Sequence, residues 1–523
     1  MKLAQKPQSG SRSRWHHLAA VAGLLAALLF PAAALADPHA VTPPQVPGIP
    51  GLPGPVAAPA TPAPSGLKIL KATPDTGPPG TPFTLTGSGL PANTDLDITW
   101  STATKQYKLD VVPDSVDFYG RIFTPMAVVL AKGRTDASGN LSMSLKFPQD
   151  YGALHDIYAV SNNVQLAKGG VLVERTYAVS PLKGPVGTTI NIKLNGLGWL
   201  GYMDTVAVIW DNHYAGFLSS VTTRGQATAT IRAAGPPGLH TLELVPASAT
   251  TPFLNIQQSA VGYLGLKRYT FRVTKDAGRP KTSVVWPLNL PTTEETKTTF
   301  SPAVTGNAKG SLSPTNGTIL TKTTLTASGL TPGAATIQWI TAVGTRTGAG
   351  YSISYNPLTQ ATVAADGTLK TEVTVPDDVG GWHTLQVLQG GKAVVSLPFR
   401  VDQSLYKGGQ DKFVVHRGDH ITFHLKGVGF TEMDNILAVT IDNSYIGYIC
   451  GFFSAGDTQL DLIASGEPGT HLVDFYPTPY KQQKGGNDIW YGATPFLTYR
   501  TDYPLLALGY RLPAYHFAYT IVK

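Results

Sequence analysis

Four histidines stand at the same kind of position, shortly after a glycine and directly before an apolar stretch. Imidazole is a common metal ligand and general base, so these positions were the first to consider for chemistry. The four are His155, His240, His383 and His471. Because they recur in four separate sequence units, folding would keep them in four separate modules rather than in one catalytic centre. We therefore predict a local role, such as a hydrogen bond from the imidazole to a turn carbonyl.

A second group of histidines lies close together in the sequence but is poorly spaced for one metal ion. A strand rises about 3.3 Å per residue, so His420 and His424 would stand roughly 13 Å apart. Zinc–nitrogen bonds of about 2.1 Å cannot bridge that distance. We therefore predict that both lie on the polar face of a strand whose other face carries Ile421, Phe423 and Leu425.

Three other features also fit structural roles. Asp211-Asn212 and Asp442-Asn443 offer too few carboxylates for Ca²⁺, which takes about six to eight oxygens, and they are typical of hairpin turns. The single Cys450 lies among apolar residues, which predicts a buried, inert thiol, with an intermolecular disulfide as the alternative. The chain has no Gly-x-Ser-x-Gly elbow. We predict no catalytic residues, no metal site and no cofactor.

One acidic cluster keeps an enzymatic alternative open. Asp110, Asp114 and Asp117 lie within a long insertion, residues 101–134, where clustered carboxylates could serve an active site. No histidine or second motif accompanies them. The expectation is therefore that the protein is not an enzyme.

Aromatic residues crowd into the last fifty or so positions. Aromatic rings with polar groups suit sugar stacking and protein interfaces. Trp490 and Tyr491, beside a Gly-Gly-Asn-Asp stretch, are the expected exposed pair, and Tyr480 and Tyr499 complete the predicted ligand-binding set. The alternative is that this region packs onto the last folded module.

The elements that carry these residues are predicted to be strands. Only 14% of the 523 residues are charged, against a usual ~25%, while 55 glycines and 41 prolines favour turns. Apolar and polar residues alternate with period two, as in Ile190-Asn191-Ile192-Lys193-Leu194. Turn residues interrupt such runs at short intervals. The fold class is therefore all-β, with antiparallel sandwiches of about 100 residues each.

The sequence repeats itself in an A–B–A′–B′ order. Thr84–Leu90 resembles Thr324–Leu330, and His155 matches His383 at an offset of 228 residues. In the second unit of each pair, Asp211 matches Asp442 and His240 matches His471, at an offset of 231. We infer duplication of an ancestral two-module block.

The N-terminus has the features of an export signal. Lys2, Lys6, Arg12 and Arg14 precede an apolar run that is too short to span a bilayer, and Ala34-Leu35-Ala36 ends it. Without these four basic residues the net charge of +7 falls to +3, which is too mild to indicate nucleic-acid binding. The predicted organisation is a signal peptide (1–36), a proline-rich linker (37–66), unit A (67–178), unit B (179–276), a linker (277–310), unit A′ (311–401) and unit B′ with its aromatic extension (402–523).

The glycine-punctuated pattern of unit B resembles bacterial IPT/TIG-like immunoglobulin-fold repeats. The motifs are Gly184-Pro185-Val186-Gly187, Gly196-Leu197-Gly198-Trp199 and Pro237-Gly238-Leu239-His240; units A and A′ show Gly77-Pro78-Pro79-Gly80 and Asp366-Gly367. The resemblance implies extracellular Ig-like sandwiches that serve as spacers, adhesion modules or enzyme accessories, and it implies no catalytic residues.

These observations predict an exported, non-catalytic adhesion or structural protein of the cell surface, the extracellular space or the periplasm. Polysaccharide or other surface proteins are the expected partners, and no membrane-spanning segment is expected in the mature chain. The alternative is a carbohydrate-binding protein that uses the C-terminal aromatics. The oligomeric state stays open.

Overall fold

The computed structural model describes residues 56–112, 115–199, 203–248, 250–258, 266–288, 303–344, 351–406, 413–431, 433–479, 493–503 and 511–523. Within these ranges the chain forms strands joined by turns, with short 3₁₀ helices such as η1 (Ile256–Gln258) and η4 (Phe452–Ser454). The fold class prediction is confirmed, because the strands build tandem antiparallel Ig-like sandwiches around apolar cores. The predicted signal peptide lies outside the described residues. No helix in the described ranges has the length and hydropathy needed to cross a bilayer.

Unit A is built from one sheet that folds back on itself. Its order is β6-β5-β8-β9-β2-β4-β7, with β1 and β3 against β9. Strand β2 pairs with β9 through Lys68 and Ile69 and then with β4 from Leu70 onward, so it changes partner halfway. The two layers enclose a core that includes Trp100. The strands are β1 (Thr61–Pro62), β2 (Lys68–Thr73), β3 (Thr76–Gly77), β4 (Pro82–Gly87), β5 (Asp95–Val112), β6 (Ser115–Arg134), β7 (Leu141–Lys146), β8 (Ala153–Ser161) and β9 (Val164–Val173).

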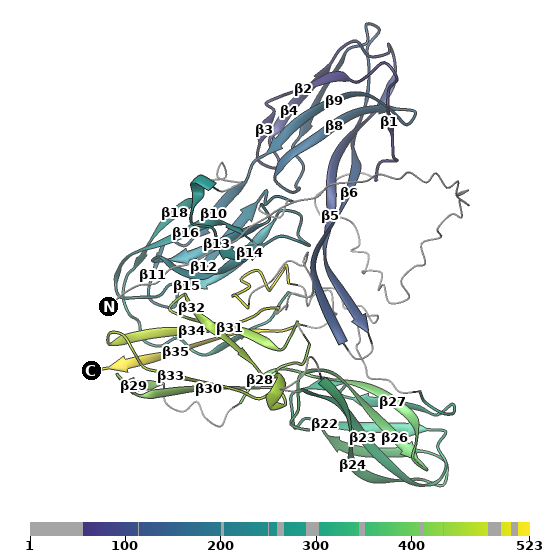
Figure 1. The fold of residues 1–523 in the computed structure, drawn as a ribbon, viewed down its shortest axis with the longest axis vertical. Coiled ribbons are helices and arrows are strands. Elements are labelled where there is room, and N and C mark those ends of the chain that lie inside the picture. The colour runs from purple at the N-terminus through teal and green to yellow at the C-terminus, as the bar shows by residue number, and fades with distance from the viewer. Residues whose placement is uncertain are drawn as a thin grey trace, which may run out of the picture. The chain divides into compact units, whose positions relative to one another are not determined.

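The insertion predicted at 101–134 is the distal part of the β5–β6 hairpin. Antiparallel pairing runs from Asp95 opposite Arg134 to Val112 opposite Ser115. Figure 1 shows the two strands as a long ribbon that continues beyond the other strands of their sheet.

Unit B has a three-stranded and a six-stranded sheet. The first is β10-β12-β15, and the second is β11-β18-β16-β13-β14 with β17 added to β16. The predicted alternation in β12 is confirmed, since Ile190, Ile192 and Leu194 are buried between exposed neighbours. The strands are β10 (Thr176–Ser180), β11 (Lys183–Gly184), β12 (Thr189–Asn195), β13 (Thr205–Trp210), β14 (His213–Ser219), β15 (Ala227–Arg232), β16 (Gly238–Ser248), β17 (Thr251–Pro252) and β18 (Lys267–Val273).

Unit A′ also pairs two sheets, β20-β22-β25 and β21-β27-β26-β23-β24, around Trp339. The β23–β24 hairpin takes the place of β5–β6 and is shorter. The strands are β20 (Lys309–Ser313), β21 (Asn316–Gly317), β22 (Lys322–Ser328), β23 (Gly333–Gly344), β24 (Tyr351–Val363), β25 (Leu369–Thr374), β26 (Gly381–Gln389) and β27 (Lys392–Val401).

Unit B′ pairs β28-β30-β33 with β19-β35-β34-β31-β32, and β29 joins β35. The strands are β19 (Ser283–Val285), β28 (Ser404–Leu405), β29 (Val414–His416), β30 (His420–Lys426), β31 (Ile436–Ile441), β32 (Ser444–Cys450), β33 (Thr458–Ile463), β34 (Gly469–Pro477) and β35 (Ala514–Val522).

Two segments predicted as linkers contribute to sheets. In the 37–66 linker, Val56 bridges Val128 and β1 pairs with β9. In the 277–310 linker, β19 pairs with β35 of the last sandwich. Both strands are two or three residues long, and their partners lie far away in the sequence, so local patterns carry no signal for them.

Units B and B′ repeat local details at the predicted offset. Both edge hairpins have a register shift at equivalent places, Val208/Ile209 and Val439/Thr440. The turn predictions are confirmed, because Asp211, Asn212, Asp442 and Asn443 all have positive φ, as two-residue hairpin loops require. The duplication event itself stays an inference from these equivalences.

Candidate functional site

The four histidines that precede strands bind the turns before them, as predicted. In every case Nε2 lies within hydrogen-bond distance of the carbonyl oxygen four residues earlier: Tyr151 at 2.8 Å, Pro236 at 2.8 Å, Val379 at 2.8 Å and Glu467 at 2.9 Å. The recurring geometry ties each strand to its turn. It assigns the four imidazoles to local folding.

The partner of the second ring nitrogen, Nδ1, differs between the A-type and the B-type units. In A and A′ it lies near a carbonyl oxygen of the adjacent strand, and His155 and His383 stack on Trp100 and Trp339 at 4.4 and 4.6 Å. In B and B′ it faces a hairpin-turn carboxylate, Asp211 at 2.5 Å or Asp442 at 2.7 Å. The hydrogen bond that His471 Nδ1 donates to Asp442 raises the pKa of His471 against the opposing effect of burial.

The remaining histidine group does not assemble a metal centre. In β30 the predicted apolar face is confirmed, since Ile421, Phe423 and Leu425 are buried while His420 is exposed. His424 bonds to Asp457, a carboxylate that also contacts Lys426. Over the part of the chain that the structure describes, no group of three or more His, Cys, Asp or Glu could hold a metal ion.

Cys450 differs from the prediction of a buried thiol. It lies at the end of β32, an edge strand, and is exposed. The side chains of Ile446 and Tyr448 on the same strand are also exposed, at 47% and 52%. The apolar sequence around Cys450 therefore marks an uncovered strand face instead of a core.

For the predicted aspartate site of the insertion, the structure gives only the backbone positions of Asp110 and Asp117. Asp110 pairs with Asp117 in register across the hairpin, and Asp114 lies outside the described residues. The proximal part of the same hairpin packs on unit B. Lys105 and Arg121 both bind Asp204, and Tyr107 Oη lies 3.2 Å from Ser219 Oγ. Burial lowers the pKa of Lys105 to about 8, although the charge of Asp204 opposes this shift.

The structure describes one of the four residues predicted to bind a ligand, Tyr499. Tyr480, Trp490 and Tyr491 lie outside the described residues. Tyr499 corrects the prediction, because it is only 1% exposed and packs against Tyr476 with ring centroids 6.2 Å apart. Within the described residues the packing alternative holds for the members Tyr476, Phe496, Tyr499, Tyr503, Tyr515, Phe517 and Tyr519, all buried.

A carboxylate anchors this C-terminal segment to unit B. Asp502 accepts hydrogen bonds from Ser219 Oγ at 2.5 Å, Val221 N at 2.7 Å and Thr222 N at 2.6 Å. Phe217 N also donates to Pro495 O at 3.0 Å. Segment 493–503 thereby joins the core of B.

The junction between A and B is built like that between A′ and B′. Gly152 N donates to Leu197 O at 2.9 Å, and Gly380 N donates to Val428 O at 3.0 Å. A Cβ on Gly152 or Gly380 would lie 1.8 or 1.9 Å from a backbone oxygen of the opposing unit, so only glycine fits. Both junctions therefore rest on direct backbone contact.

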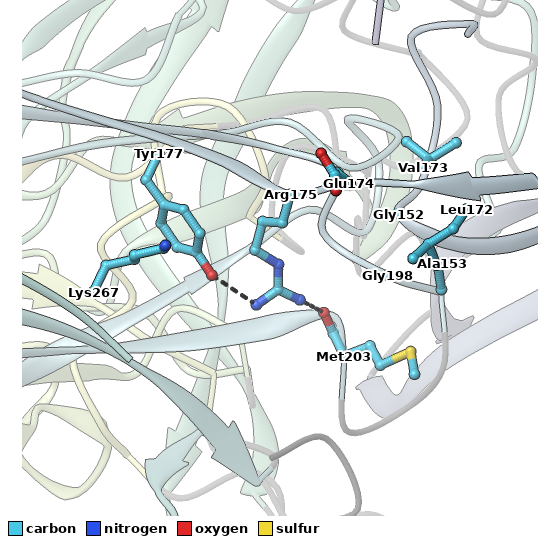
Figure 2. Close-up of a pocket in the computed structure, with 11 residues that line it drawn as sticks. Gly152, Ala153, Leu172, Val173, Glu174, Arg175, Tyr177, Gly198, Met203 and Lys267 are labelled. Carbon is cyan, nitrogen blue, oxygen red and sulfur yellow. Dashed lines mark hydrogen bonds between the residues drawn. The ribbon is translucent and has the colours of Figure 1, made fainter. Parts of the chain in front are cut away.

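The A–B junction also contains a cavity of about 350 Å³ (Figure 2). Arg175, directly before β10, projects into this region. Its Nη2 donates to Met203 O at 2.6 Å, and its Nη1 lies 3.5 Å from Tyr177 Oη. Lys267 Nζ lies 5.8 Å from the centre of the Tyr177 ring. The lining thus combines two cations with a phenol hydroxyl.

The sequence analysis did not single out Arg175, Tyr177 or Lys267. Arg175 and Tyr177 stand about 90 residues before Lys267, and none of the three belongs to a motif. The one available signal was the comparison between halves, because Gln403 stands 228 residues after Arg175. Pairing registers place Tyr515 of β35 at the position of Lys267 in β18.

No family model matches the chain, and no curated protein matches it in sequence. Similar solved structures include Salmonella alpha-2-macroglobulin reacted with methylamine (8% identity, TM-score 0.17, 77% of this chain, 28% of that chain). They also include the Yersinia pseudotuberculosis adhesin InvE (15% identity, TM-score 0.14, 44% of this chain, 58% of that chain). A third is the structure of the N-terminal eight Ig domains of Down Syndrome Cell Adhesion Molecule, DSCAM (13% identity, TM-score 0.12, 81% of this chain, 47% of that chain). The chain spans about a quarter of the first protein and under two thirds of the others. At these TM-scores the matches carry no information on function.

Proposed function

We propose that the protein is an exported, non-catalytic adhesion or structural protein whose IPT/TIG-like Ig modules present binding surfaces outside the cytoplasm. The observation that carries this proposal is the repeated junction. The same glycine-to-carbonyl hydrogen bond joins A to B and A′ to B′. Such a contact fixes one module on the next, which suits a spacer or a presenting scaffold.

The use of polar side chains supports the same proposal. Histidine commonly serves in catalysis, but the four histidines that precede strands are bound to turn carbonyls. Buried carboxylates such as Asp150, Asp474 and Asp502 join separate units through Arg224, Arg232 and the loop at Val221. Their roles are in assembly, which leaves recognition to exposed strands and loops.

An attachment assay tests the proposal. Beads coated with the full chain should adhere under flow to matrix-protein, polysaccharide or cell surfaces more strongly than albumin-coated beads. Equal attachment on all these surfaces would contradict an adhesive role. Turnover of substrates in a broad hydrolase and transferase panel would contradict a non-catalytic one.

The carbohydrate-binding alternative at the C-terminal aromatics stays a prediction for Trp490, Tyr491 and Tyr480. A glycan array probed with the full chain and with Trp490→Ala checks it. Retention that depends on Trp490 is the expected result of that alternative, and absence of retention contradicts it.

A further inference from the structure

We propose that the cavity at the A–B junction binds a small ligand that carries an oxyanion, of the size and chemistry of an acidic monosaccharide unit. This site is separate from the C-terminal aromatics and goes beyond the proposed adhesive or structural role. Its volume of about 350 Å³ falls in the range of small-molecule sites, roughly 300–1,000 Å³.

The charge of the lining favours an anion. Arg175 and Lys267 contribute two positive charges, and Glu174 is the one carboxylate among the lining residues. Figure 2 shows the Glu174 side chain extending away from the guanidinium of Arg175, whereas Tyr177 lies between Arg175 and Lys267. The cationic groups and the phenol hydroxyl thus converge, and the opposing charge points elsewhere.

Arg175 is held in place before any ligand arrives. The bond from its Nη2 to Met203 O fixes the plane of the guanidinium. Within the described part of the chain, its Nε is buried and has no hydrogen-bond partner. Because this Nε is closed to the cavity, the positive charge of the guanidinium, and not this donor, is what favours an oxyanion there. Guanidinium groups match carboxylate, sulfate and phosphate geometry, and their hydrogen bonds to such anions are among the stronger ones in proteins.

The remaining lining explains why the ligand would be a compact polar molecule. Tyr177 and Lys267 offer a ring edge, a hydroxyl and a flexible ammonium on one side of the cavity. Gly152, Gly196 and Gly198 also line the cavity and have no side chains, so the backbone itself forms part of the wall. A ring bearing hydroxyl groups and one oxyanion fits this combination of donors and bare backbone.

The second half of the chain supplies an internal control. At the equivalent A′–B′ junction, Gln403 replaces Arg175 and Asp434 replaces Met203, since Gly429 N bonds to Asp434 O as Gly198 N bonds to Met203 O. Tyr515 stands where Lys267 does. The cationic pair therefore belongs to the first junction, while the backbone geometry is common to both. The substitution Arg175→Gln introduces the residue that the chain itself uses at this position.

Isothermal titration of the full chain with sodium glucuronate, glucose and inorganic phosphate tests the proposal. Glucuronate should bind and glucose should not. Arg175→Gln and Lys267→Gln should each weaken binding about tenfold or more, because each removes a charge-assisted contact. Glu174→Gln should strengthen it a few-fold. Lys370→Gln, an exposed substitution in unit A′, is the matched control and should leave the affinity unchanged.

The two anions identify the source of the oxyanion. Binding of phosphate alone would support the site and assign it to a phosphorylated ligand. Binding of glucuronate would assign it to a carboxylate sugar. Absence of binding for both anions would overturn the proposal, as would equal affinity for wild type, Arg175→Gln and Lys267→Gln. Because the bead assay reads attachment and this titration reads a soluble anion, failure of one leaves the other result standing.

Discussion

At the residue scale, many buried polar side chains form hydrogen bonds or ion pairs that connect turns, strands and units. Asp150 illustrates the pattern. One of its oxygens accepts from Trp100 Nε1 within unit A at 2.8 Å, and the other accepts from Arg224 of unit B at 2.9 Å. In the second half Asp378 binds Trp339 in the same way, but Ala455 stands where Arg224 would be. The two junctions thus share a backbone contact and differ in charge.

Arg224→Ala removes that charge while keeping a residue tolerated in the same left-handed conformation, since Arg224 and Ala455 both have φ of 52°. Loss of one partner of a buried ion pair costs about 3–5 kcal/mol. We expect the first unfolding transition of the variant to fall by several degrees in calorimetry. Arg134→Ala breaks an exposed pair with Asp95 and should cost under ~1 kcal/mol. Equal effects of the two substitutions would contradict the account.

His471 provides a pH-dependent prediction. The hydrogen bond that its imidazole donates to Asp442 raises its pKa above 6.5, so its contribution to stability is present below the unfolded pKa and is lost as pH rises through the folded pKa. NMR titration should show Asp442→Asn lowering the pKa of His471. Asp366→Asn, a substitution in another exposed turn, should leave that pKa unchanged. A pKa insensitive to Asp442→Asn would refute the assigned cause.

At the element scale, the sequence was sufficient for the strands whose signal is local. Alternation identified β12 and β30, and the Asp-Asn pairs identified the turns before β14 and β32. The sequence could not identify β19, because this three-residue strand is defined only by its pairing with β35, more than two hundred residues away. The same limit applies to the cavity, since Arg175 and Lys267 stand about 90 residues apart in the chain and line one cavity only after unit B has folded. The prediction that Cys450 is buried was wrong for a different reason, because its apolar neighbours in the sequence lie on an exposed edge strand.

The C-terminal segment gives a prediction at this scale. Asp502→Asn replaces an acceptor-only carboxylate that faces two backbone N–H groups with an amide that has one acceptor oxygen. The amides of Val221 and Thr222 should then exchange with solvent faster, as measured by hydrogen exchange. Thr501→Ala, at the adjacent position, should leave them protected. Unchanged exchange in Asp502→Asn would show that segment 493–503 does not anchor this loop.

At the scale of the whole molecule, the folded units are joined by more than linkers. Besides the A–B and A′–B′ junctions, Arg232 of B binds Asp474 of B′ at 2.6 Å. Burial would raise the pKa of Asp474, but the charges of Arg232 and His516 outweigh it and hold the pKa below its ordinary value. Backbone contacts, buried ion pairs and segment 493–503 together connect the units. These contacts are compatible with the scaffold role proposed above.

The glycines of the two junctions test this account most directly. Hydrogen exchange of the full chain should show the amides of Gly152 and Gly380 protected to a similar degree, because each donates to a carbonyl of the next unit. Exchange at the rate of an unstructured peptide at either glycine would show that the units are not joined there in solution, and it would contradict the central claim.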